Sequence, residues 1–210
     1  VNPHRLHLGI VGFELGEDIT STHITDIDQT LDMWKGVVNS NFKLNGEEFK
    51  VETSCHPSID MIAARITSKA QAGVNFRFPY PTGGHADDAC NWNANDEHTT
   101  TIYNQDEQSV VLKRQLDDTE YYVTIRWEGE AKLSEKSKNY FVLKPETDTF
   151  AFTCAFTPNA PITETITAEE TQSAAATYWM SFWKDGAAVD FSKCTDPRAK
   201  ELERRVVLTQ

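Results

Sequence analysis

Apolar and polar residues alternate along most of the first 160 positions, a pattern typical of half-buried β-strands. In the clearest example, Phe42 and Leu44 flank a polar residue, and the alternation resumes at Phe49. Asn45-Gly46 lies between these two segments. Both central positions of a tight hairpin turn need a positive φ, which Asn and Gly tolerate, so this pair predicts a β-hairpin.

Further strand-like runs follow the hairpin. We expect strands at residues 61–67, 74–80, 109–115, 121–127, 139–143 and 150–156. Turn-forming residues separate these runs, as at Asp117-Asp118 and Lys144-Pro145-Glu146. Many short strands without helices between them favour an antiparallel sandwich over a parallel βαβ architecture.

A long polar segment at residues 81–99, rich in Gly, Asp and Asn, interrupts this rhythm. Long loops in compact domains are usually functional or disordered, and Trp92 favours a function. An aromatic ring packs against the C–H groups of a sugar, while neighbouring polar side chains bond its hydroxyl groups. The residues predicted to contact carbohydrate are Asn91, Trp92, Asn93, Asp96 and His98. The alternative is structural: Trp92 pins the loop onto the core, and its polar neighbours form solvated turns.

Acidic pairs in the same segment were considered as catalytic groups. A glycosidase needs two carboxyl groups about 5 to 10 Å apart, and Asp87-Asp88 and Asp96-Glu97 are the pairs near an aromatic residue. With 32 acidic residues in the chain, some pair meets this spacing by chance. The sequence therefore assigns no catalytic residue.

The last part of the chain changes to a helical pattern. Thr167 and Glu170 have the spacing of a capping box, and an apolar run continues to Gly186, where we expect the helix to end. Asp196-Pro197 predicts the start of a second helix, because proline suits the first helical position.

The apolar residues of the two predicted helices are expected to pack against different surfaces. Trp179 and Trp183 lie one turn apart on the first helix, and burial against the sheet is favoured over a sugar platform. On the second helix, an apolar stripe has no evident partner in this sequence: Leu202, Val206, Val207 and Leu208. We expect this stripe to pack against another protein domain or, in the isolated chain, to promote self-association.

Charge argues against two classes of partner. The chain has 32 acidic and 20 basic residues, a net charge of -12. Nucleic acid and anionic membrane surfaces both require clustered basic residues, so we exclude them as partners. No apolar run approaches the roughly 20 residues that span a bilayer.

Metal and cofactor motifs are not found. His4 and His7 fall on opposite faces of a strand, and a calcium ion held by Asp87, Asp88 and Asp96 would lack the regular loop pattern of known calcium sites. We therefore predict no metal and no cofactor.

The cysteines are four and widely spaced, without a zinc-site signature. Cys55 and Cys154 lie in strand-like runs and are candidates for buried thiols. Cys90 and Cys194 lie in loops and could pair in a secreted protein, and we expect an extracellular or secreted location.

Two sets of residues resemble a known family. The first set is residues 2–9 (NPHRLHLG), 28–36 (DQTLDMWKG) and 55–57 (CHP). The second is Tyr178-Trp179, Phe182-Trp183, Asp190, Asp196-Pro197-Arg198 and residues 201–208 (ELERRVVL). Together they resemble the N-terminal part of six-hairpin glycosidase-like proteins, related in architecture to glycoside hydrolase family 65.

The resemblance implies a mainly β fold, an antiparallel supersandwich like that of galactose mutarotase with C-terminal linker helices. Residues 1–160 would form the sandwich, and residues 161–210 would lead to a helical catalytic barrel that is absent from this sequence. It further implies a non-catalytic domain that braces the barrel and contributes a loop, residues 82–98, near the carbohydrate site. A stand-alone carbohydrate-binding, lectin-like module and a small enzyme with an unidentified carboxylate pair are the alternatives.

Overall fold

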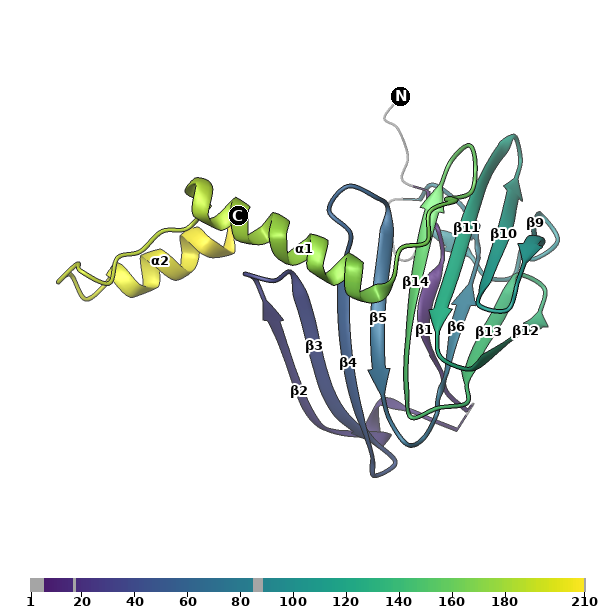
Figure 1. Cartoon of the computed structure of the whole chain (residues 1–210), viewed down its shortest axis with the longest axis horizontal. Helices are drawn as coiled ribbons and strands as arrows, with labels where there is room; N and C mark the ends of the chain where they lie inside the picture. Colours follow the sequence, from purple (N-terminus) through teal and green to yellow (C-terminus); the bar gives the residue numbers. More distant parts are fainter. Residues whose placement is uncertain (1–5, 17, 85–88, 210) are drawn as a thin grey trace.

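The computed structural model describes residues 6–16, 18–84 and 89–209. The fold is mainly antiparallel β, a sandwich of two sheets followed by helices, which confirms the predicted fold class (Figure 1). The first helix packs against several strands of the larger sheet, and the second helix extends beyond the sandwich.

The larger sheet has eight strands, and every neighbouring pair in it is antiparallel. In spatial order they are β2 (Ile24–Asp32), β3 (Val37–Leu44), β4 (Glu47–Cys55), β5 (Met61–Thr67), β14 (Thr149–Thr157), β11 (Thr119–Glu128), β10 (Ser109–Leu116) and β9 (His98–Gln105).

The smaller sheet has four antiparallel strands: β1 (Ile10–Glu14), β6 (Gly73–Arg77), β13 (Tyr140–Pro145) and β12 (Ala131–Ser137). Two further short strands, β7 (Tyr80–Pro81) and β8 (Cys90–Asn91), pair with each other. A single 3-10 turn, Ser21–His23, precedes β2.

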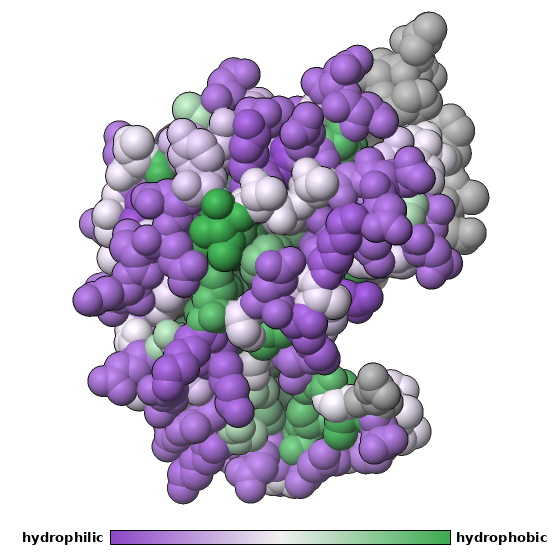
Figure 2. Space-filling model, turned by 90° about the vertical axis from the view of Figure 1, so that its right-hand side faces the viewer, coloured by the Kyte–Doolittle hydropathy of each residue, from purple (hydrophilic) through white to green (hydrophobic). Residues whose placement is uncertain are grey.

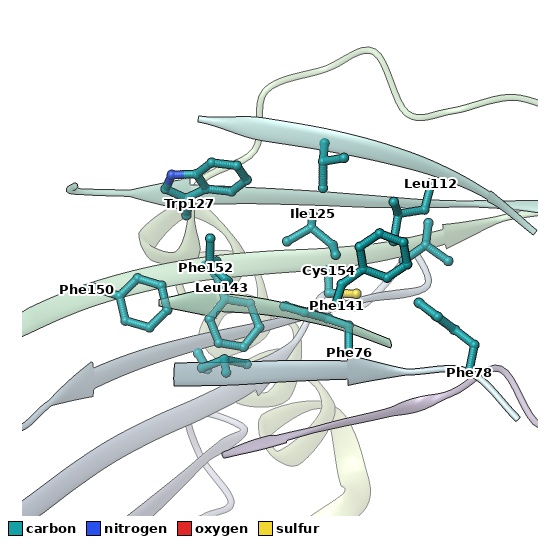
Figure 3. Packing of buried hydrophobic residues seen from close by; sticks show 14 of the residues in the cluster. Phe76, Phe78, Leu112, Ile125, Trp127, Phe141, Leu143, Phe150, Phe152 and Cys154 are labelled. Carbon is teal, nitrogen blue, oxygen red and sulfur yellow. The ribbon is translucent and has the colours of Figure 1, made fainter. Parts of the chain in front are cut away.

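The core lies between the two sheets, where alternate residues of facing strands meet (Figure 3). Phe76 on β6 and Phe152 on β14 pack edge to face, with ring centroids 5.7 Å apart. Leu112, Ile125 and Phe141 are completely buried. Each such side chain contributes about 1.5–3 kcal/mol of burial energy, so this layer dominates the stability of the sandwich.

The predicted hairpin is confirmed. Asn45 and Gly46 have φ values of 51° and 87°, as the turn between β3 and β4 requires. Phe42 and Phe49 face each other across the two strands, stacked with their centroids 5.1 Å apart.

The strands expected from residue 61 onward are all present, but several boundaries and elements were missed. The sequence analysis did not predict β1, β2, β9 or β12, whose exposed faces or edge positions weaken the alternation. Lys144 and Pro145 belong to β13, so the turn starts after them. Cys154 is fully buried as expected, whereas Cys55 is exposed.

Both helices form near the predicted positions. The first, α1 (Ala168–Phe182), starts with the expected capping box of Thr167 and Glu170. A π-helical turn (Trp183–Ala187) follows, in which Gly186 takes a φ of 131°. The second, α2 (Ala199–Leu208), begins two residues after Pro197. Within the described ranges, no helix is long and apolar enough to cross a bilayer.

The first helix is fastened to the larger sheet at both ends. Ala168 at its start is buried with Ala63 and Ala151 on the face of the sheet that points away from the core. Near its end, Trp183 is only 7% exposed, and its Nε1 donates a hydrogen bond of 2.7 Å to the carbonyl oxygen of Met33. Trp179 packs against the backbone of Gly36. Both tryptophans therefore have the structural role predicted for them.

Candidate functional site

The predicted carbohydrate-contact residues lie between β8 and the start of β9. Side-chain hydrogen bonds shape this turn: Asn91 Oδ1 accepts from the Asn93 amide at 3.0 Å, and Asn95 Nδ2 donates to the Trp92 carbonyl at 3.3 Å. Asn91 and Asn93 are exposed. Asp87 and Asp88, considered above as acids and calcium ligands, lie outside the described residues.

Trp92 is partly buried against the outer face of the smaller sheet. The Arg77 guanidinium carbon lies 4.6 Å from the centroid of its ring, and the His7 ring approaches edge-on at 6.2 Å between centroids. Cation–π packing of this kind holds the loop to the sheet. Trp92 thus holds the loop to the sheet while part of its ring remains accessible.

Asp96 lies at the surface, with 94% of its side chain exposed, and pairs with Lys138 at 2.6 Å. The hydrogen bond and charge of Lys138 lower the pKa of Asp96. An exposed pair of this kind contributes little to stability. Asp96 is therefore ionised and accessible at neutral pH.

His98 differs from the other predicted contacts because it faces the interior. It is 2% exposed, and its Nδ1 accepts a hydrogen bond of 2.8 Å from Arg114 Nη1. Its Nε2 lies 3.4 Å from Asn139 Nδ2. Burial, together with the positive charges of Arg114 and Lys138, lowers the pKa of His98 to about 4. The structure therefore separates this neutral, buried ring from the exposed Asn91, Asn93 and Asp96.

Arg114 is a central residue that the sequence analysis missed. Its side chain is completely buried between the sheets, and Nη1 donates to Thr100 Oγ1 at 2.7 Å as well as to His98. Further acceptors are the carbonyl oxygens of Thr99 and Pro79, Asn139 Oδ1 and the Tyr121 hydroxyl. All of these acceptors are formally neutral, and no carboxylate pairs with Arg114 in the described ranges. The sequence does contain an indication of this burial. Arg114 is two residues from both Leu112 and Leu116, so on a strand it lies on the same face as these apolar residues.

A second polar cluster covers the outer face of the smaller sheet. The Glu14 carboxylate accepts hydrogen bonds from Lys136, Tyr140 and Asn75. Burial alone would raise the pKa of Glu14, but these hydrogen bonds outweigh it and lower the pKa. Arg77 joins this cluster, with its guanidinium carbon 5.2 Å from the Tyr140 ring centroid.

Hydrophilic side chains cover most of the end of the molecule shown in Figure 2, and hydrophobic ones are visible within a hollow. One apolar groove of about 190 Å³ lies between β1 and the inner face of β4 and β5, lined by residues such as Phe13 and Val51. Among the residues described, no group of three or more His, Cys, Asp or Glu side chains could hold a metal ion.

Comparisons with known proteins give a distant structural likeness and no family. No protein-family model and no curated protein matches the sequence. Among solved structures, the chain is similar to one titled "Putative kojibiose phosphorylase from human microbiome", with a TM-score of 0.42 and 11% identity. The superposition covers 87% of this chain and 24% of that one, so the chain spans about a quarter of its length. Such a distant likeness carries no conclusion about activity.

Proposed function

We propose that this chain is a non-catalytic N-terminal supersandwich domain of a six-hairpin glycoside hydrolase. In this role the sandwich braces a helical catalytic barrel, and the loop at residues 82–98 contributes to the rim of the carbohydrate site. The sequence resemblance motivates the proposal, and the antiparallel sandwich with C-terminal helices is consistent with it.

The observation that carries the proposal is the apolar surface of the helical arm, defined here as α1, the π-helical turn and α2. Trp183 fixes the arm to the sandwich through Met33. Large apolar side chains nevertheless remain exposed along it: Tyr178 at 48%, Met180 at 42%, Leu202 at 52% and Leu208 at 67%. Exposed apolar surface marks protein interaction sites, so an arm whose α1 is fixed to the sheet is suited to hold a second protein body.

Substitutions on α2 test this role in the native polypeptide. Leu202→Gln and Leu208→Gln should each lower its stability by about 1–2 kcal/mol, because burial against the barrel is lost. Lys200→Gln, at an exposed polar position of the same helix, is the matched control and should have little effect. Equal effects of all three substitutions in thermal denaturation would contradict the proposal.

Two further measurements separate an accessory domain from a complete enzyme. The native polypeptide should have a mass well above the 23.7 kDa of this chain. The purified 210-residue chain should not cleave α- or β-glycosides. Hydrolysis by this chain alone would overturn the non-catalytic role.

A stand-alone carbohydrate-binding module is the second candidate, favoured by the partly accessible ring of Trp92 beside the exposed Asn91 and Asn93. The test is binding to a glycan array. Trp92→Ala should abolish binding while the circular dichroism spectrum is retained. Trp34→Ala, which removes a tryptophan that is 48% exposed elsewhere, is the control. Binding that survives Trp92→Ala would exclude this loop as the contact.

A further inference from the structure

Arg77 is a cation that has no acidic partner among the described residues. Its side chain is partly exposed, and its guanidinium carbon lies 4.6 Å from the Trp92 ring centroid and 5.2 Å from that of Tyr140. In the part of the chain that the structure describes, Arg77 forms no ion pair. Aromatic rings orient a guanidinium but leave its N–H donors unsatisfied, because their faces interact with its charge.

The acid on the same sheet face is already bound. Glu14 accepts hydrogen bonds from Lys136, Tyr140 and Asn75, so its carboxylate has its own partners. The chain has a net charge of -12, so acidic side chains are plentiful. Arg77 nevertheless packs against the rings of Trp92 and Tyr140. The arrangement keeps the planar fork of Arg77 available for an external anion.

Two buried polar atoms near Arg77 also have no protein partner. His7 Nδ1 is buried and unbonded, and the His7 ring contacts Trp92 edge-on. Asn75 Oδ1 is likewise unbonded, and Asn75 lies two residues before Arg77 on the same face of β6. Unsatisfied buried polar atoms are uncommon, and an ordered water molecule would satisfy them.

We propose that Arg77 and Trp92, with His7 packed against the Trp92 ring, form a subsite for a sugar residue that carries a carboxylate. This inference rests on the proposed contact between Trp92 and carbohydrate and names the class of sugar. The accessible part of the Trp92 ring packs against the C–H groups of the sugar, and the N–H donors of Arg77 bind its carboxylate through paired, charge-assisted hydrogen bonds. The edge-on contact of His7 holds the Trp92 ring in place.

The test compares acidic with neutral oligosaccharides of equal length, using galacturonic acid and galactose oligomers as probes in isothermal titration calorimetry. The intact chain should bind the acidic oligomer at least about tenfold more tightly, and added salt should reduce this preference. Arg77→Met should remove the preference, while Arg77→Lys should retain part of it because the charge remains without the bidentate fork.

Arg65→Met is the matched control, because Arg65 is another partly exposed strand arginine and lies on β5 of the other sheet. This substitution should leave the preference unchanged. Thermal melts verify that each variant is folded.

The outcomes separate this inference from the proposed function. Equal binding of both oligomers that is lost in Trp92→Ala overturns the acidic subsite and leaves the carbohydrate contact intact. A preference unaffected by Arg77→Met overturns the assignment to Arg77. Binding of neither oligomer overturns both the subsite and the carbohydrate contact of the loop.

Discussion

Arg114 Nη1 donates a hydrogen bond to His98 Nδ1 across 2.8 Å, joining the middle of β10 to the first residue of β9 inside the protein. The same guanidinium reaches Asn139, whose Nδ2 donates to the carbonyl oxygen of Asn95. One buried cation therefore connects the core of the sandwich to the loop that carries Trp92.

Replacing Arg114 should destabilise the protein strongly. Arg114→Met keeps the volume but leaves His98 Nδ1 and Thr100 Oγ1 without their guanidinium donor, at a cost of about 2–4 kcal/mol. Urea unfolding measures the change. Lys113→Met, which removes a surface ion pair with Glu120, should have a much smaller effect. Similar losses for the two variants would show that the buried cluster is not important.

The stability of the fold should depend on pH through His98. Its pKa is about 4 in the folded protein and 6.5 in the unfolded chain. Between these values the unfolded state binds the proton and the folded state does not, so stability falls as pH drops from 6.5 toward 4. The slope approaches about 1.4 kcal/mol per pH unit for this one group.

His98→Gln provides the comparison for this pH dependence. Unfolding free energies measured from pH 7.5 to 4.5 should show a flatter profile for the variant than for the unmodified chain. Parallel profiles would mean that His98 is not held neutral by its burial and by Arg114.

Gly36 should not tolerate a side chain. A Cβ atom there would lie 2.1 Å from Trp179 Cδ1, and the φ of +64° adds backbone strain. Gly36→Ala should cost about 2–4 kcal/mol, because the helix must move away from the sheet or the backbone must shift. Gly46→Ala shares the positive φ but has nothing within 4 Å, so about 1 kcal/mol is expected. A smaller loss at Gly36 than at Gly46 would contradict the packing of Trp179.

The isolated chain should self-associate through α2. Leu202 and Leu208 are 52% and 67% exposed, and their apolar surface can be buried between two copies. Light scattering should show a mass that rises with concentration, and a Leu202→Lys, Leu208→Lys double variant should remain monomeric. A monomer at high concentration before any substitution would count against this surface.

Local sequence determined the features whose partners are close along the chain. Asn45-Gly46 specified a hairpin because the required positive φ values are properties of those two residues. Thr167 and Glu170 specified a helix start because each bonds the backbone of the other, three residues away. The strands of the core could be predicted from the sequence because their apolar residues alternate and point into the same hydrophobic core.

Tertiary structure decided the surroundings of the polar residues. The sequence placed His98 beside Trp92 in one loop, but the sheet turns His98 inward to Arg114, 16 residues away. The Trp92 ring packs against Arg77, which lies on β6. Trp183 donates a hydrogen bond to the carbonyl oxygen of Met33, 150 residues away in the sequence. Strand alternation determines which face a side chain takes. Whether that face meets water, a buried arginine or an aromatic ring depends on how segments distant in sequence pack together.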